Sequence, residues 1–377
     1  MQLTRIEWAI LHAERPRTAG KNARLDEHGR IIRLPIARFT AADGQTGFGW
    51  SRLTPERACQ LLHTELPTTL KDICADPALR DIEYPLLDLL AASSNLPVWR
   101  WTMPPARPSS LIEEQRPTIA CYDTTLYFDD LHLRDLQAAA DYMADEAIEG
   151  YEQGHRAFKI KVGRGARHLP LSEGMQRDIA IVKAIRVAVG PQCLLMADAN
   201  NGFNLNLTKH FLEQTAECHL YWLEEPFHED PVLWEDLRRW CQTHNLHILL
   251  ADGEGLAANS LVNWAQRGLL DIIQYDIIHP GFLFWLNLVP QLDHFNIRAA
   301  PHSYGNLYGN YVSGHLAPSL QGFLMIEWDE ASTPALDRTR YSVQNGHVSL
   351  PNVPGFGLGL NEAAFHQAVT ETGWIIP

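Results

Sequence analysis

Residues 194–200, with the sequence LLMADAN, form a short apolar run that ends in a carboxylate and an amide. Side chains alternate between the two faces of a β-strand, so Met196, Asp198 and Asn200 are expected on the same face. The pattern therefore predicts a charged group at the end of a buried strand face.

The same arrangement occurs twice more along the chain. In residues 221–226 (YWLEEP), Trp222 and Glu224 share a face and the proline ends the strand. In residues 248–254 (ILLADGE), alternation places Leu250, Asp252 and Glu254 on one face. Three predicted strands thus end in an acidic residue, and each is separated from the next by about one strand-plus-helix unit.

Around these stretches, strand and helix patterns alternate from residue 116 onward. Eight strands are predicted, at residues 118–122, 157–162, 193–199, 220–224, 248–252, 272–277, 297–300 and 323–326. Helical stretches are predicted at residues 133–153, 175–189, 207–217, 231–244, 257–267 and 283–295. This pattern predicts an α/β fold with a TIM-like (β/α)8 barrel, in which catalytic groups lie at the carboxyl ends of the strands.

The residues before the barrel have a different pattern. We predict an α+β capping domain at 1–115, the barrel at 116–330 and a C-terminal segment at 331–377. The capping domain has predicted strands at 2–11, 31–39 and 47–51, and predicted helices at 55–63 and 76–94, the second kinked at Pro85. Two further stretches are a polar loop at 15–29, favoured as an exposed turn over a lid, and a proline-rich linker at 97–117.

Lysines alternate with apolar residues on the second predicted barrel strand. The apolar residues of FKIKV (158–162) are expected to face the helices, so Lys159 and Lys161 point into the barrel. Burial of two ammonium groups costs free energy unless carboxylates or an anionic ligand form ion pairs with them. Lysines that reach solvent at a strand edge are the alternative.

Further polar residues end the last three predicted strands. Asp276 and His302 end neighbouring strands, and Glu327 is an inward carboxylate at the end of the eighth. An aspartate bonded to an imidazole fixes its tautomer and raises its basicity, which prepares a general base. Arg164, His168 and Tyr304 could contact polar substrate groups, although ordinary surface or loop roles are favoured.

Composition limits the classes of partner. The chain of 377 residues is 46% hydrophobic, enough for a sizeable core, and its net charge of −14 argues against nucleic-acid or anionic-membrane partners. Six widely spaced cysteines and a start without signal-peptide features favour a cytoplasmic protein.

The motifs together resemble the mandelate racemase branch of the enolase superfamily: Lys-x-Lys at 159–161, DAN at 198–200, WLEEP at 222–226, GE at 253–254, YD at 275–276, His302 and Glu327. The closing run at 350–359 is similar to the family's last turn before the chain returns to the capping domain. The resemblance implies a Mg²⁺ cofactor, a small carboxylate substrate and a homo-oligomer.

The resemblance also implies roles for individual residues. Mg²⁺ would be held by Asp198, Glu224 and Glu254, with Asp252 as the alternative third ligand. Lys161 and the His302–Asp276 pair would be acid/base groups on opposite faces of the substrate. The remaining implied roles are catalytic for Lys159 and Glu327 and substrate-binding for Asn200.

The expected chemistry is removal of the proton α to a carboxylate, which creates an enediolate. General acid/base groups contribute about 10²–10⁴-fold, so a cation must stabilise the developing charge. The paired lysines and the metal should lower the lysine pKa. Dehydration of a sugar acid to a 2-keto-3-deoxy acid is the leading hypothesis. Racemisation or epimerisation of a 2-hydroxy acid and a non-catalytic ligand-binding barrel are the alternatives.

Overall fold

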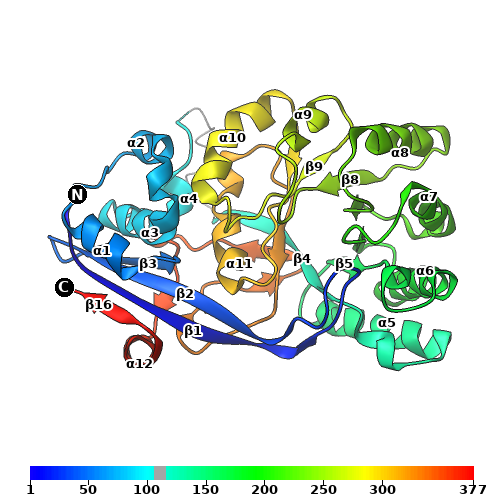
Figure 1. The fold of residues 1–377 in the computed structure, drawn as a ribbon, viewed down its shortest axis with the longest axis horizontal. Coiled ribbons are helices and arrows are strands. Elements are labelled where there is room, and N and C mark those ends of the chain that lie inside the picture. The colour runs from blue at the N-terminus through cyan, green and yellow to red at the C-terminus, as the bar shows by residue number, and fades with distance from the viewer. Residues whose placement is uncertain (106–115) are drawn as a thin grey trace.

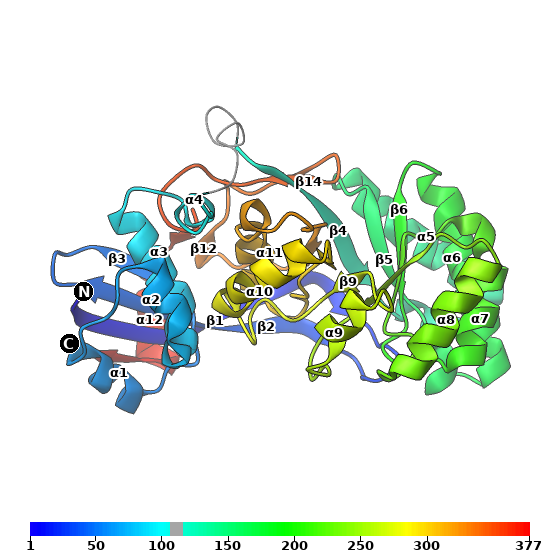
Figure 2. The same ribbon diagram turned by 90° about the horizontal axis from the view of Figure 1, so that it is seen from above.

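The structure is a computed structural model that describes residues 1–105 and 116–377. Figures 1 and 2 show two parts side by side, a smaller sheet-and-helix domain that contains both termini and a larger barrel. Across the described residues, no helix is long and apolar enough to cross a membrane.

The capping domain is built on an antiparallel sheet with the strand order β16-β1-β2-β3. Its strands are β1 (Leu3–Ala19), β2 (Gly29–Ala41), β3 (Thr46–Trp50) and β16 (Trp374–Ile376). Its helices are α1 (Pro55–Leu62), α2 (Leu70–Ala75), the 3-10 helix η1 (Pro77–Ile82), α3 (Glu83–Ser93), α4 (Val98–Trp101) and α12 (Glu362–Thr372). Because the last strand pairs with the first, the C-terminal segment completes this domain, as the resemblance implied.

The hairpin β1–β2 is longer than predicted, so the expectation of an exposed loop at 15–29 holds only for its tip, residues 24–27. Strand β1 continues to Ala19, which pairs with Gly29, and the side chains of Arg15 and Asn22 are buried. The hairpin reaches from the capping domain to the barrel (Figure 1). The alternative prediction, a cover over the barrel, describes this segment better.

Two other local expectations also differ from the structure. The helix expected at 76–94 is divided into η1 and α3, and Pro85 lies in the first turn of α3, where its missing N–H costs no intrahelical bond. The stretch expected as a linker at 97–117 begins with the buried turn α4, and its residues 106–115 lie outside the described part of the chain.

The barrel consists of eight parallel strands, which confirms the predicted fold class. They are β4 (Thr118–Leu126), β5 (Ala157–Lys161), β6 (Leu194–Asp198), β7 (Trp222–Glu224), β8 (Leu249–Asp252), β9 (Ile272–Ile273), β10 (Arg298–Ala299) and β11 (Ile326–Trp328). Strand β11 pairs with β4, and a bridge between Ala299 and Phe323 joins β10 to the segment before β11, so the sheet closes.

Helices cover the outside of the barrel (Figure 2). They are α5 (Leu136–Glu152), α6 (Leu171–Val189), α7 (Leu205–Gln214), α8 (Pro231–Thr243), α9 (Leu261–Gln266), α10 (Phe282–His294) and α11 (Leu307–Gly314). Helix α11 was not predicted from the sequence. The short elements η3 (Asp129–His132), η4 (Arg164–Ala166), η5 (Ala216–Cys218), η6 (Ala317–Ser319), β12 (Leu336–Asp337), β13 (Val343–Gln344), β14 (His347–Ser349) and β15 (Gly359–Leu360) complete the chain.

A small apolar cluster fills the barrel interior, separate from the larger core between strands and helices. Its buried members are Tyr122, Ala157, Met196, Trp222, Ala251, Ile272, Ala300 and Met325. They belong to the layers that come before the carboxyl ends of the strands.

A buried carboxylate joins the capping domain to the barrel. Glu83 of α3 accepts hydrogen bonds from the backbone N–H groups of Phe282 (3.0 Å) and Leu283 (2.9 Å) at the start of α10. A helix N-terminus has unpaired N–H groups and favours negative charge. Burial nevertheless raises the pKa of Glu83 to about 8.

Replacing Glu83 by alanine should destabilise the protein, because two buried N–H groups would lose their acceptor. The expected loss is about 1–3 kcal/mol, measured as a lower urea midpoint. Glu152→Ala, on the exposed end of α5, is the control and should have little effect. An equal loss in the two variants would contradict the role of Glu83 as a link between the domains.

Candidate active site

Three carboxylates meet at the carboxyl ends of neighbouring barrel strands. Asp198 ends β6 and pairs in register with Glu224 of β7, and Glu254 follows β8. One oxygen from each lies within 4.8 Å of the others. All three belong to the set predicted from the sequence.

A turn after β8 decides which of its two acids enters this cluster. Asp252 pairs in register with Ile273, which packs in the outer core, so Asp252 points toward the helices. Gly253 has φ +136°, and an added Cβ there would lie 2.9 Å from the N atom of Gln274. This turn redirects the chain and brings Glu254 inward.

The expectation that Leu250, Asp252 and Glu254 share one face therefore holds for Leu250 and Asp252, which both face outward, and is wrong for Glu254. Neither carboxylate oxygen of Asp252 has a hydrogen-bond partner among the described residues. Burial and the nearby Glu229 raise its pKa well above the usual value. Its position outside the barrel interior leaves Glu254 as the third member of the cluster.

Both lysines of β5 point into the barrel. Lys159 Nζ lies 2.8 Å from Glu224 Oε1 and 3.0 Å from Glu327 Oε1. Lys161 Nζ donates a hydrogen bond to Asp198. Their side chains are 0% and 3% exposed, so the alternative of lysines that reach solvent is wrong.

Before a cation binds, the surrounding carboxylates raise the pKa of both lysines. Burial alone would lower the pKa of Lys161, but the carboxylate of Asp198 raises it above the usual value. The pKa of Lys159 is raised in the same way by Glu224 and Glu327, against its burial. The surrounding negative charge thus outweighs the repulsion between the two ammonium groups. The predicted lowering, which includes the effect of a bound metal ion, stays a prediction.

Asp276 and His302 form a hydrogen-bonded pair at the ends of β9 and β10. His302 Nδ1 donates to Asp276 Oδ1, which leaves Nε2 facing the carboxylates, 3.1 Å from Glu254 Oε2. Burial would lower the pKa of His302, but Glu327, Glu254 and Asp276 raise it to about 10. Lys161 and His302 therefore contact different members of the carboxylate cluster, Asp198 and Glu254.

Glu327 is held by several donors rather than free to move. It accepts hydrogen bonds from Thr124 Oγ1 (2.7 Å), the Ser303 N–H (2.6 Å) and the Tyr304 N–H (3.0 Å). Burial would raise the pKa of Glu327, but Lys159, His302 and these donors lower it. The carboxylate fixes both Lys159 and the loop that follows His302.

Asn200 lies behind the cluster and is 1% exposed. Its amide nitrogen donates to Glu254 Oε1 (2.9 Å) and to Glu225 Oε2 (3.2 Å). The residue has φ +41°, a conformation that asparagine tolerates better than most residues. In this structure Asn200 orients a carboxylate, and contact with substrate stays a prediction.

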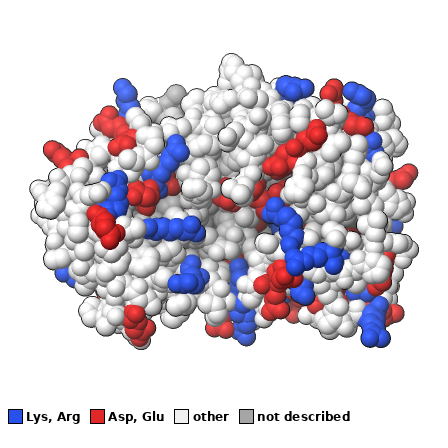
Figure 3. All heavy atoms as spheres, viewed as in Figure 1, with Lys and Arg blue, Asp and Glu red and all other residues white. Residues whose placement is uncertain are grey.

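Three surrounding segments outside the predicted set of site residues also lie at the site. Arg24, in the turn of the β1–β2 hairpin, donates to Glu254 Oε1 at 3.2 Å. The polar composition of that turn was the only signal. Trp50, Arg52 and His279 line a cavity that also contains Asp276 and His302. Figure 3 shows the surface hollowed between the two parts of the molecule, with acidic and basic side chains around the hollow.

Arg164 and His168 have structural contacts instead of the surface positions favoured from the sequence. Arg164 is fully buried and makes ion pairs with Asp130 (2.6 Å) and Asp178 (2.8 Å). His168 Nε2 lies 2.8 Å from the carbonyl oxygen of Asn22, so it anchors the hairpin turn.

The carboxylate cluster fits a hard divalent cation. Its donors are all oxygens, as Mg²⁺ prefers, and Asp198 and Glu224 are buried while Glu254 is partly buried. Burial and the charge of Asp198 raise the pKa of Glu224 to about 7. A divalent cation would offset this repulsion, so Asp198, Glu224 and Glu254 are the residues that would hold it.

Comparison with known proteins agrees with this geometry. Residues 142–364 match the family model described as enolase C-terminal domain-like. A solved structure of galacturonate dehydratase from Geobacillus sp., in complex with D-galacturonate and 5-keto-4-deoxy-D-galacturonate, is 44% identical. It has a TM-score of 0.93, with 100% of this chain and 99% of that chain covered.

Curated relatives are more distant. D-galactarolactone cycloisomerase of Agrobacterium fabrum is 26% identical, with 59% of each chain covered. D-xylonate dehydratase of Haloferax volcanii is also 26% identical, with 66% of this chain and 62% of the relative covered. The match thus spans about three fifths of the length of these curated relatives.

The carboxylate cluster leads to a prediction about metal binding. Mg²⁺ at 100 times its Kd should stabilise the wild type by about 2.7 kcal/mol, seen as a higher melting temperature. Asp198→Asn and Glu224→Gln should abolish this rise, because each removes charge from the site. Asp252→Asn, outside the barrel interior, is the control and should keep it. Loss of the rise in Asp252→Asn alone would contradict the assignment.

Proposed function

The chain belongs to the mandelate racemase and muconate lactonizing enzyme branch of the enolase superfamily, and on that basis we propose that it dehydrates a sugar acid with Mg²⁺ as cofactor. The supporting observation is the carboxylate cluster, with Lys161 against Asp198 and His302 against Glu254. A cation site flanked by two proton-transfer groups is what α-proton removal needs.

The reaction begins with a hydrogen that is only weakly acidic. When bound, Mg²⁺ would supply positive charge that stabilises the enediolate oxygens formed on removal of that hydrogen. Asp198, Glu224 and Glu254 hold the ion in this proposal. Lys159, fixed by Glu224 and Glu327, supplies further positive charge next to the substrate carboxylate.

Lys161 and His302 divide the proton transfers. One removes the hydrogen from the α-carbon, and the other gives a proton to the hydroxyl that leaves from the neighbouring carbon. Asp276 holds the imidazole in the tautomer that directs Nε2 toward the reacting centre. The products are a 2-keto-3-deoxy acid, numbered from the carboxylate, and water.

A uronic acid is the substrate class that we favour. The Geobacillus relative, which this chain matches over its whole length, was solved with D-galacturonate and 5-keto-4-deoxy-D-galacturonate. Numbered from the carboxylate instead of the aldehyde, that second compound is a 2-keto-3-deoxy acid. It is therefore the kind of product expected here from a substrate of the same class.

Racemisation of a 2-hydroxy acid is the second candidate, since it uses the same enediolate and the same two groups. A non-catalytic ligand-binding barrel is less well supported, because such a protein needs no opposed pair of proton-transfer groups. The homo-oligomer expected from the family resemblance remains part of the proposal.

Incubation of the Mg²⁺-loaded protein with D-galacturonate should yield a keto-deoxy acid, detected by its carbonyl reaction and by NMR. Removal of Mg²⁺ with a chelator should stop the reaction, and added Mg²⁺ should restore it. Recovery of unchanged galacturonate together with its C5 epimer would favour the racemase or epimerase alternative instead.

Single variants should separate the two proton transfers. His302→Asn should abolish dehydration, yet retain Lys161-dependent exchange of the α-hydrogen for substrates of the matching configuration, and Lys161→Ala should show the reverse preference. The measurement is α-hydrogen exchange by NMR in D₂O, with both α-configurations offered. Turnover at the wild-type rate in either variant would remove that residue from the mechanism.

A further inference from the structure

His28 lies in the hairpin turn that reaches the barrel, and the mechanism above does not use it. Its ring makes edge contacts with Tyr127, at 4.9 Å between ring centroids, and with Tyr304, at 5.7 Å. The two tyrosines stack on each other at 4.8 Å. Tyr127 in turn lies next to the proton-transfer lysine, with Lys161 Nζ 5.3 Å from the ring centroid.

The tautomer of His28 is fixed by the backbone. Nδ1 lies 2.9 Å from the carbonyl oxygen of Gly20, which can only accept, so Nδ1 must carry the proton. Burial lowers the pKa of His28, and the charges of Lys161 and Arg15 lower it further. These effects favour the neutral form of the ring, in which Nε2 has a lone pair. Among the described residues, Nε2 has no hydrogen-bond partner.

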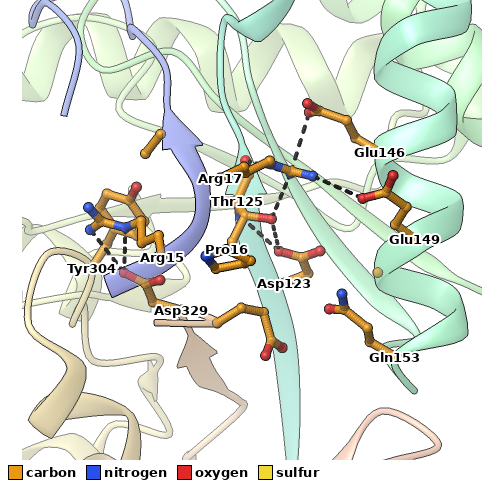
Figure 4. A pocket seen from close by; sticks show the side chains of 13 residues that line it. Arg15, Pro16, Arg17, Asp123, Thr125, Glu146, Glu149, Gln153, Tyr304 and Asp329 are labelled. Carbon is orange, nitrogen blue, oxygen red and sulfur yellow. Dashed lines mark hydrogen bonds and ion pairs between the residues drawn. The ribbon is translucent and has the colours of Figure 1, made fainter. Parts of the chain in front are cut away.

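Two arginines hold the β1 strand that leads to this turn. Arg15 makes an ion pair with Asp329 at 3.0 Å and lies over the Tyr304 ring, and Arg17 bonds the carbonyl oxygen of Thr125 at 3.2 Å. Figure 4 shows Arg15 and Arg17 directed to opposite sides of the strand, toward Asp329 and toward Glu149. The strand is thus tied to β11, β4 and α5.

The turn itself is also fixed to the barrel. Phe128 donates its N–H to the Lys21 carbonyl at 2.9 Å, and Arg167 bonds the Arg24 carbonyl at 2.7 Å. The same turn brings Arg24 onto Glu254. One part of the turn therefore contacts the carboxylate cluster, while His28 lies beside the aromatic ring next to Lys161.

From this placement we propose that His28 determines specificity, its Nε2 atom accepting a hydrogen bond from a hydroxyl group on the sugar-acid chain. The inference rests on the proposed function, because it assumes a carboxylate bound at the metal. A hydroxyl is the chemistry that fits, since a neutral imidazole nitrogen needs a donor. The residue would select polyhydroxy acids over acids that lack distal hydroxyls.

The test compares two ligands that share the metal-binding end. D-gluconate and lactate both carry an α-hydroxy carboxylate, but only gluconate has further hydroxyls. Binding to the Mg²⁺-loaded protein is measured by calorimetry. In His28→Asn, which can keep the bond to Gly20 but lacks the distal acceptor, gluconate should bind about three- to tenfold more weakly, while lactate is unchanged.

Two further variants make the result specific. His28→Gln places an amide oxygen near the position of Nε2 and should recover most of the gluconate affinity. His132→Asn is the matched control, because His132 Nδ1 also lies 2.9 Å from a backbone carbonyl, that of Asp129, but in an exposed turn. It should bind both ligands as the wild type does.

An equal loss of gluconate and lactate in His28→Asn would show a structural role and overturn the proposal, as would unchanged binding of both. The proposal would also be overturned if His28→Gln weakened gluconate binding as much as His28→Asn does. None of these measurements needs turnover. Failure to dehydrate D-galacturonate would therefore reject that substrate and leave the binding test of His28 intact.

Discussion

The main constraint on the site is the electrostatic repulsion between carboxylates that are buried close together. Asp198, Glu224, Glu254 and Glu327 all face the same small space, and Lys159, Lys161 and His302 supply the local positive charge. Carboxylates at such distances are costly in a low-dielectric interior unless cations balance them. A cation bound at the site offsets this electrostatic cost. The negative charges of the same carboxylates raise the pKa values of the lysines and of the His302 imidazole.

The fold keeps these charges apart from the apolar parts of the molecule. A single apolar cluster fills the barrel interior beneath the charged layer, and residues of the capping domain line the space above that layer. Glu83 ties the cap to α10, and Arg15 ties the long hairpin to Asp329. The substrate space is therefore made from both domains, which allows residues far apart in the sequence to contact one ligand.

Much of the barrel and of the carboxylate cluster could be predicted from the sequence, because the alternation of side chains along a strand is a strong geometric constraint. Alternation alone is enough to place Lys159, Lys161, Asp198 and Glu224 inside the barrel. It fails after Gly253, where the backbone leaves strand geometry: Asp252 faces outward with Leu250, as alternation requires, but Glu254 turns inward. No periodicity could have shown this, since the reversal comes from a single residue with positive φ.

The hairpin turn was the larger omission, for a different physical reason. Its polar residues are typical of exposed loops, and only tertiary contacts bury Asn22 and bring Arg24 to Glu254. The lysine pKa values also depend on carboxylates from several other strands, which the pattern of one strand cannot show. The lowering expected with a bound metal ion stays a prediction.

In the proposed mechanism, one cation site and two flanking proton-transfer groups act on neighbouring carbons of one bound sugar acid. The most direct measurement is a crystal structure of the protein with Mg²⁺ and a slowly reacting sugar acid. We expect the ion among Asp198, Glu224 and Glu254, with the α-carbon between Lys161 Nζ and His302 Nε2. An ion bound elsewhere, or both nitrogens on the same face of the substrate, would contradict this mechanism.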